Sequence, residues 1–156
     1  MRIAFLVAVG WIGSSGIASF ASAEDAHTLV TPDDAKWAPA PKMLPAGAET
    51  AVLFGDPTKE GLFALRLKVP SGYVVAPHTH PADEVVTVIS GTIKFGMGEA
   101  ADRSAAKALP VGSFFALPPG MAHFAYFDEE TVVQITTNGP WGIKYVSPAD
   151  DPQKSQ

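Results

Sequence analysis

Residues 72–91 read GYVVAPHTHPADEVVTVISG and concentrate side chains that bind metals. His78 and His80 stand two residues apart, and Glu84 follows four residues later. Side chains alternate between the two faces of an extended strand, so these three side chains share one face. A lone carboxylate is costly to bury, whereas neutral imidazoles and a carboxylate together suit a divalent transition ion. The stretch therefore predicts a metal site.

Residues 112–127 read GSFFALPPGMAHFAYF and supply a further candidate ligand. The turn at residues 118–120 redirects the chain just before an apolar segment that starts near His123. A histidine at that position would complete a set of four ligands. Asp83 has the opposite parity to the predicted ligands, so we expect it to be solvated or to support a ligand from outside. His27 lies in the N-terminal stretch, and no role is assigned to it.

Short apolar runs separated by glycine and proline fill the chain from Thr50 onward. Residues 61–69 alternate cleanly, which predicts a strand with one buried face. That face would carry Phe63, Leu65, Leu67 and Val69. Further strands are expected at 85–90, 92–97, 113–117, 122–127, 131–137 and 141–146, with an exposed connection at 99–107. Many short strands with such turns are typical of an all-β sandwich or barrel.

The first 23 residues have the pattern of a targeting segment. Arg2 gives a positive start, an apolar run covers residues 3–12, and residues 21–23 (Ala-Ser-Ala) form a cleavage signature. The alternative is a membrane anchor, but the apolar run is shorter than the ~20 residues that a spanning helix needs. We expect cleavage after Ala23, a periplasmic or secreted mature protein, and no stable membrane insertion after cleavage.

Charge and composition limit the classes of partner that the protein is expected to bind. The formal net charge is −5 at pH 7, and phosphate binding needs a basic surface, so nucleic acid is not expected as a partner. The chain has no cysteine, so its stability must come from core packing. Frequent prolines disfavour helix before residue 50, and residues 37–48 are interpreted as an extended arm anchored by Trp37. Residues 24–35 fit a disordered linker better.

Together the two stretches resemble the motifs of the cupin superfamily. The first motif, G-x5-H-x-H-x3-E-x6-G, is matched in full by Gly72, His78, His80, Glu84 and Gly91. The second, G-x5-P-x-G-x2-H-x3-N, is matched by Gly112, Pro118, Gly120 and His123, with Phe127 in place of the final asparagine.

The resemblance implies a double-stranded β-helix, which is a small jelly-roll-like barrel and often a homodimer. It implies one divalent transition metal ion held by His78, His80, Glu84 and His123, without distinguishing Fe, Mn, Zn, Ni and Co. The expected organisation is a signal peptide at 1–23, an extended arm at 24–49, the barrel at 50–147 and a C-terminal tail at 148–156.

The wall of the predicted pocket follows from strand parity. A type II′ hairpin turn around Gly91 would set Val88 opposite Phe95 and Val86 opposite Met97. The pocket candidates are therefore Val86, Val88, Phe95, Met97 and Phe127, with Phe63 and Leu65 as further candidates.

Two orientations stay open at the sequence level. Phe127 either narrows the metal cavity or packs at the end of the barrel against Phe63 or Trp37. In residues 131–137, a preceding two-residue loop turns Gln134 and Thr136 inward, whereas a three-residue loop turns Val133 and Ile135 inward.

Two classes of function fit the predicted site. The first is an exported metalloenzyme that acts on a small organic molecule. Every evident titratable group inside is a ligand, so dioxygenase-type oxidation is favoured over lyase or isomerase chemistry, which needs a separate base. The second is a non-catalytic module that binds or senses a small molecule at the metal. The fold alone does not choose between them.

Overall fold

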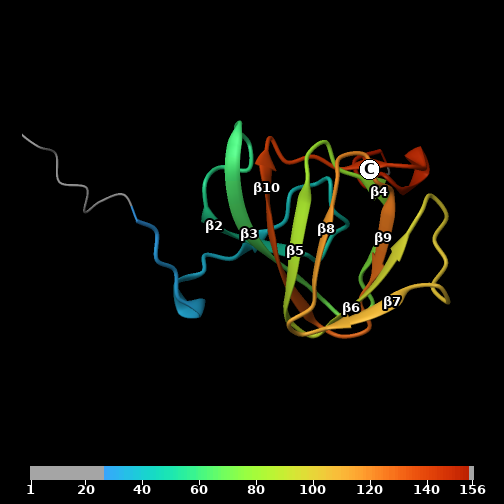
Figure 1. Cartoon of the computed structure of the whole chain (residues 1–156), viewed down its shortest axis with the longest axis horizontal. Helices are drawn as coiled ribbons and strands as arrows, with labels where there is room; N and C mark the ends of the chain where they lie inside the picture. Colours follow the sequence, from blue (N-terminus) through green and yellow to red (C-terminus); the bar gives the residue numbers. More distant parts are fainter. Residues whose placement is uncertain (1–26, 155–156) are drawn as a thin grey trace, which may run out of the picture.

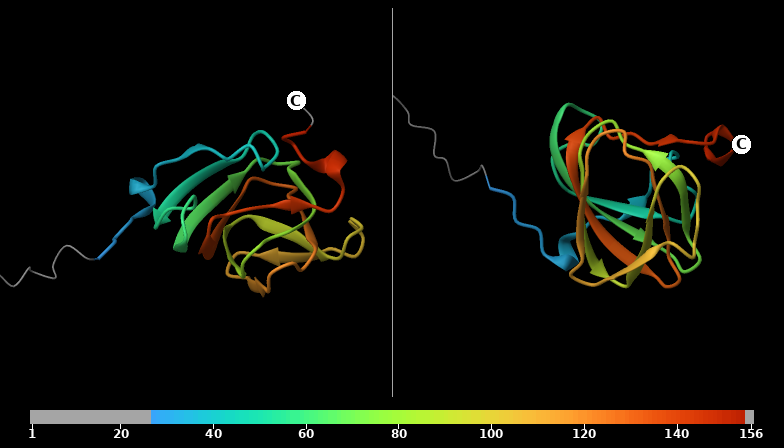
Figure 2. Two further views of the ribbon diagram at one scale, coloured as in Figure 1. Left: turned by 90° about the horizontal axis from the view of Figure 1, so that it is seen from above. Right: turned by 45° about the vertical axis from the view of Figure 1, so that its right-hand side comes forward.

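Two antiparallel β-sheets face each other and enclose the core (Figures 1 and 2). The structure is a computed structural model and describes residues 27–154. The larger sheet has the strand order β1-β2-β3-β10-β5-β8, and the smaller has the order β11-β4-β9-β6-β7. This jelly-roll arrangement confirms the all-β double-stranded β-helix predicted from the sequence.

The larger sheet consists of β1 (Ala38–Pro39), β2 (Glu49–Phe54), β3 (Gly61–Val69), β10 (Thr131–Gly139), β5 (Glu84–Ser90) and β8 (Phe114–Leu117). The smaller sheet consists of β11 (Lys144–Tyr145), β4 (Val74–Thr79), β9 (His123–Tyr126), β6 (Thr92–Met97) and β7 (Lys107–Pro110). Short 3₁₀ helices span Pro32–Asp34 and Pro148–Asp150.

Strand β3 carries the apolar face that its sequence predicts. Phe63, Leu65, Leu67 and Val69 are at most 5% exposed, and they form part of the core between the sheets. In β10, Val133 and Ile135 are buried while Gln134 and Thr136 are only partly covered. The inward orientation of Val133 and Ile135 is therefore the correct alternative, although the connection before β10 spans four residues, 127–130, instead of three. This connection carries the chain from the smaller sheet to the larger one.

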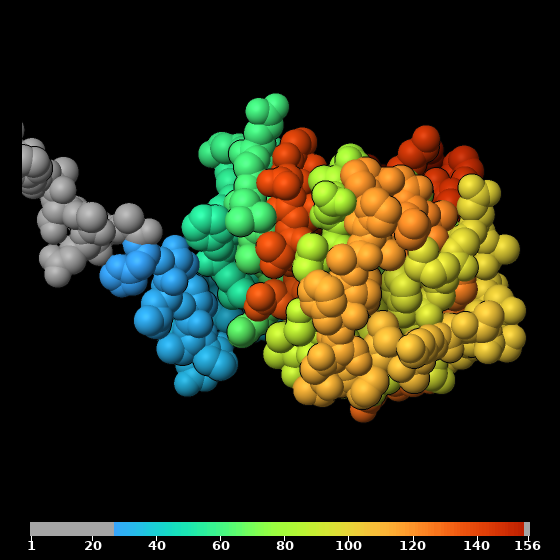
Figure 3. All heavy atoms as spheres, viewed as in Figure 1, coloured from blue at the N-terminus to red at the C-terminus, as the bar shows by residue number. Residues whose placement is uncertain are grey.

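The proline-rich segment before β2 packs onto the barrel. Its strand β1 pairs with the start of β2, and Leu44 and Ala48 are buried in the core. The hydroxyl of Tyr73 donates to the carbonyl of Pro45 at 2.6 Å. The ring of Trp37 lies 4.7 Å from Nζ of Lys68 on β3. Figure 3 shows the segment after residue 27, in blue, at the β2 side of the body.

The structure does not test the targeting segment or the domain boundaries. The targeting segment and cleavage site at residues 1–23 lie outside the described residues, and the domain boundaries stay predictions. No helix in residues 27–154 is both long and apolar enough to cross a membrane.

The hairpin expected around Gly91 is wrong. Strands β5 and β6 belong to different sheets: β5 pairs with β10 and β8, whereas β6 pairs with β7 and β9. Both edges of β5 are thus occupied by strands distant in the sequence, and β6 has no free edge to join. Gly91, with a φ of 72°, turns the chain from one sheet into the other. The predicted pairs of Val86 with Met97 and of Val88 with Phe95 do not form.

Replacing Gly91 by alanine should destabilise the fold more than the same change at Gly112. Both glycines have positive φ, at 72° and 83°, which costs an alanine about 1–2 kcal/mol. A Cβ at Gly91 would also lie 2.5 Å from Oγ1 of the fully buried Thr131 and 2.6 Å from the Glu130 carbonyl. Relieving that overlap should add about 1–3 kcal/mol.

The matched control is Gly112→Ala, because a Cβ there meets nothing within 4 Å. Urea denaturation of the two variants measures both free energies of unfolding. Equal losses of unfolding free energy in the two variants would show that the backbone around Thr131 moves aside without a measurable cost.

Candidate metal centre

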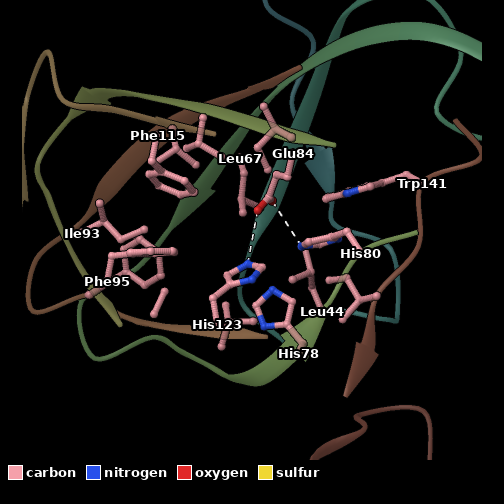
Figure 4. A pocket seen from close by; sticks show the side chains of 17 residues that line it. Leu44, Leu67, His78, His80, Glu84, Ile93, Phe95, Phe115, His123 and Trp141 are labelled. Atoms are coloured by element: carbon pink, nitrogen blue, oxygen red, sulfur yellow. Dashed lines mark ion pairs between the residues drawn. The ribbon is translucent and has the colours of Figure 1, made fainter. Parts of the chain in front are cut away.

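Three histidines from the smaller sheet meet a carboxylate from the larger sheet inside the barrel (Figure 4). His78 in β4 is the register partner of His123 in β9, and His80 follows directly after β4. Glu84 is the first residue of β5, so the turn at residues 81–83 crosses between the sheets. One ring nitrogen from each histidine lies within 4.8 Å of the others. The structure therefore brings together the four residues that the two motifs single out.

Backbone carbonyls fix the orientation of each imidazole. Nδ1 of His78 and Nδ1 of His123 each donate to the carbonyl two residues earlier, at 2.7 Å and 3.0 Å. Nδ1 of His80 donates to the carbonyl of Gly142 at 2.8 Å. Because a carbonyl oxygen only accepts, each Nδ1 carries a ring proton, and a neutral ring then keeps its lone pair on Nε2. Metal-ligating histidines are commonly held in this way.

Glu84 presents its two oxygens to two of these nitrogens. Oε1 lies 3.3 Å from Nε2 of His80, and Oε2 lies 3.2 Å from Nε2 of His123. Nε2 of His80 and Oε2 of Glu84 are buried and have no hydrogen-bond partner among the described residues. Buried polar atoms left unpaired are costly, and electron pairs that face one another repel. A cation between them would remove both costs, so the residues present fit a bound metal ion.

Burial favours neutral imidazoles. It lowers the pKa of His78 to about 3, with further lowering from the neighbouring His123 and His80. Burial also lowers the pKa of His80, although the nearby carboxylate opposes the shift. For Glu84, burial alone would raise the pKa, but the surrounding imidazoles outweigh burial and hold the pKa below its usual value. A carboxylate beside the neutral imidazoles of His78 and His80 matches the needs of a divalent ion.

The four side chains line a cavity of about 50 Å³. A water molecule needs roughly 10–15 Å³ of such space, so the cavity holds only a few waters or a small ligand. Its remaining walls are apolar and include the rings of Phe95, Phe115, Phe127 and Trp141. Among the described residues that line it, Trp141 is the only other one with a polar side-chain atom.

Comparison with known proteins identifies the family. Residues 25–142 match the family described as the ChrR cupin-like domain. The chain belongs to this cupin family. The match confirms the superfamily that the two histidine-containing motifs predict.

Plant germin-like proteins are related to this cupin. Germin-like protein subfamily 2 member 1 of Arabidopsis thaliana is 38% identical over 65 residues, which are 41% of this chain and 30% of that protein. Germin-like protein 3-1 of Oryza sativa subsp. japonica is 30% identical over 81 residues, which are 51% of this chain and 36% of that protein. The cupin thus spans about a third of the length of these curated relatives.

Solved structures share its fold over most of their length. A polyketide cyclase from Streptomyces resistomycificus superposes with a TM-score of 0.62 at 14% identity, over 82% of this chain and 91% of that chain. A proposed acetylacetone dioxygenase from Methylibium petroleiphilum also has a TM-score of 0.62, at 16% identity, over 81% of this chain and 85% of that chain. At such identities the likeness shows the fold and leaves the chemistry to the site.

Three of the five predicted pocket residues of this cupin line the cavity. These are Val86, Phe95 and Phe127. The predictions for Val88 and Met97 are wrong: Val88 is packed in the core away from the cavity, and Met97 is 49% exposed at the end of β6. Both residues keep the parity of their neighbours Val86 and Phe95, but Val88 is buried in the core outside the cavity and Met97 is the last residue of β6, so position along the strand rather than parity excludes them.

Two further cavity residues lie on strands that the sequence predicts. Leu67 reaches the cavity from the predicted apolar face of β3, in place of the candidates Phe63 and Leu65. Phe115 lies on β8, two residues before the partner of Glu84. Trp141 lies in the irregular segment after β10: the strand predicted over 141–146 forms only at β11 (Lys144–Tyr145).

Asp83 and His27 lie outside the centre. Asp83 is exposed, in agreement with a solvated carboxylate, and His27 is exposed near the start of the described chain.

Proposed function

We propose that this cupin binds one divalent transition metal ion and uses it to oxidise a small organic molecule in a dioxygenase-type reaction. The observation that carries the proposal is the pair of buried, unpartnered atoms, Nε2 of His80 and Oε2 of Glu84, beside two further imidazoles. The ligands would be Nε2 of His78, His80 and His123 and the carboxylate of Glu84. A redox-active ion held there would supply Lewis acidity and electron exchange with O₂.

The protein's own groups would hold the metal ligands in position and shield the cavity from water. Carbonyl bonds to Nδ1 hold the three imidazoles so that they need no rearrangement to accept an ion. The apolar wall excludes bulk water, which strengthens electrostatic interactions inside the cavity. A single carboxylate offsets one of the two charges of a divalent ion, leaving about one positive charge to attract a substrate.

The lack of a titratable group beyond the four proposed ligands, among the described cavity residues, supports oxidation over proton transfer. Among the described residues that line the cavity, the acidic and basic side chains are the four ligands. Lyase and isomerase chemistry usually needs a base within reach of the substrate proton, and a ligand already committed to an ion serves poorly. The same cavity would also suit a non-catalytic binding module, and the next experiment separates the two functions.

Oxygen uptake should depend on a redox-active metal. Protein reconstituted with Fe²⁺, Mn²⁺ or Zn²⁺ would be mixed with small monocarboxylates and diketones in an oxygen-electrode cell. We expect uptake with iron or manganese, none with zinc, and none with His123→Ala under the same loading. Binding of these compounds without uptake for any metal would favour the non-catalytic module.

We also propose that the protein is exported and cleaved after Ala23. The support is the Ala-Ser-Ala signature that follows an apolar run too short to span a bilayer. In a secreting host, mass spectrometry of the mature protein should therefore give Glu24 as its first residue. An intact Met1 on the soluble protein would refute the cleavage.

A homodimer is the proposed assembly. Large apolar side chains are exposed on the outer face of the larger sheet: Phe54, Leu62 and Phe114 are 49%, 55% and 62% exposed. Figure 3 shows β3, β10, β5 and β8 forming one continuous face on that side. Exposed apolar surface of this kind favours association. Light scattering during size-exclusion chromatography would decide, and a monomer mass at micromolar concentration would reject the dimer.

A further inference from the structure

The indole of Trp141 is a hydrogen-bond donor without an acceptor. Its Nε1 is buried and has no partner among the described residues. The residue lines the cavity together with His80 and Glu84, and Figure 4 shows its ring reaching from the segment after β10 toward them. Buried indole N–H groups normally find an acceptor, so this one indicates a group that the protein itself does not supply.

The segment Gly139–Ile143 fixes this ring in place. The backbone N–H of Trp141 donates to the carbonyl of Pro57 at 2.7 Å, and the next residue, Gly142, accepts from Nδ1 of His80. The ring itself packs edge-on against Phe63, with centroids 6.2 Å apart. The backbone bonds hold the segment, and turning the indole toward solvent would break its contact with Phe63.

Of the two described pockets that Trp141 lines, only the cavity has room for the missing acceptor. The narrow gap on the other side of this segment, beside Pro81 and Asn138, has no space for a water molecule. The cavity has about 50 Å³. A group inside the cavity can therefore accept from Nε1, and a group in the gap cannot.

The cavity also limits the charge of its occupant. Among the described residues that line it there is no lysine or arginine. With Glu84 as the anionic ligand of a divalent ion, one negative charge on a substrate is neutralised. A second carboxylate would be buried against apolar walls without a counter-charge, which is strongly unfavourable.

We infer that Trp141 donates its indole N–H to an oxygen of the substrate, and that the substrate is a small monoanion with a short apolar body, such as an aliphatic monocarboxylate. The inference rests on the proposed function, because it takes the centre as metal-bound. Trp141 would then determine specificity: it recognises one oxygen, while the apolar wall accommodates the remainder.

The test uses the full chain loaded with Zn²⁺, labelled with nitrogen-15 in its indoles, and titrated with butyrate. We expect the indole resonance of Trp141 to move downfield while that of Trp37 stays in place. Trp141→Phe should weaken butyrate binding about tenfold in calorimetry, the usual effect of losing a hydrogen bond to a charged group. Trp37→Phe is the matched control, because that ring lies on the outer surface against Lys68. Succinate, with its second charge, should bind more weakly than butyrate.

The outcomes test the metal centre and the role of Trp141 separately. Zinc well below one ion per chain would refute the metal centre itself. With zinc at about one per chain, an unmoved Trp141 resonance, unchanged affinity in Trp141→Phe, or tighter binding of succinate would overturn this inference alone. If Trp141→Phe does not fold, the wild-type titration still decides, with the resonance assigned by elimination from Trp11→Phe and Trp37→Phe.

Discussion

Replacing His80 by alanine should empty the metal centre. Purified wild-type protein is expected to carry about one divalent transition ion per chain, and the variant to carry less than a tenth of that. Outer partners of metal ligands alone change affinity by about 10- to 100-fold, so removing a ligand should exceed that range. The substitution also leaves Glu84 facing a void on one side, since its Oε1 lies 3.3 Å from Nε2 of His80.

The measurement is elemental analysis after dialysis against buffer of defined metal content. His27→Ala is the matched control, because it makes the same chemical change at an exposed position away from the cavity. The control should retain full occupancy. Full occupancy in His80→Ala as well would remove His80 from the ligand set and defeat the proposed centre.

Replacing Phe127 by alanine should cost about 3–5 kcal/mol of folding free energy, the usual range for a buried phenylalanine. The side chain is 3% exposed, and its ring packs edge-on against Tyr73 with centroids 6.2 Å apart. It lines the cavity too, but it lies four residues beyond His123, or about 13 Å along an extended chain. Metal content should therefore stay the same.

Val111→Ala is the control for this change, since its side chain is 62% exposed and outside the proposed dimer surface. Thermal or urea denaturation should show a loss below about 1 kcal/mol there. A loss of similar size in both variants would mean that the ring of Phe127 contributes little packing. A fall in bound metal for Phe127→Ala would place its effect nearer the centre than the strand geometry indicates.

The two open readings of Phe127 show where parity stops being informative. Alternation places its side chain on the inner face, and burial agrees. Alternation does not say how far along the barrel the metal lies, and that distance decides whether an inward ring contacts a substrate or only the core. Here the ring lines the cavity and packs on Tyr73, a partner that neither alternative named.

The comparison between β5 and β6 shows the same limit for strand pairing. A glycine between two apolar runs is a strong local signal for a tight turn, and Gly91 does turn the chain. Whether the flanking strands then pair depends on competition for strand edges. Strands β10 and β8 occupy both edges of β5, although they follow it by some forty and twenty-five residues.

The sequence by itself determined which four residues form the candidate centre and which face of β3 is buried. Both depend on the alternation of side chains along one strand, a property with a period of two residues that needs no distant partner. The spacing of His78, His80 and Glu84 is of this kind, and the motif containing His123 added the fourth residue.

Only the tertiary structure decided which strands share a sheet and what closes the cavity. The Gly142 carbonyl that holds Nδ1 of His80 lies 62 residues away in the chain, and the indole of Trp141 arrives with it. Neither belongs to a repeating pattern. Their positions follow from how the two sheets stack and where β10 ends, which is set by long-range packing of the whole core and leaves no periodic trace in the local sequence.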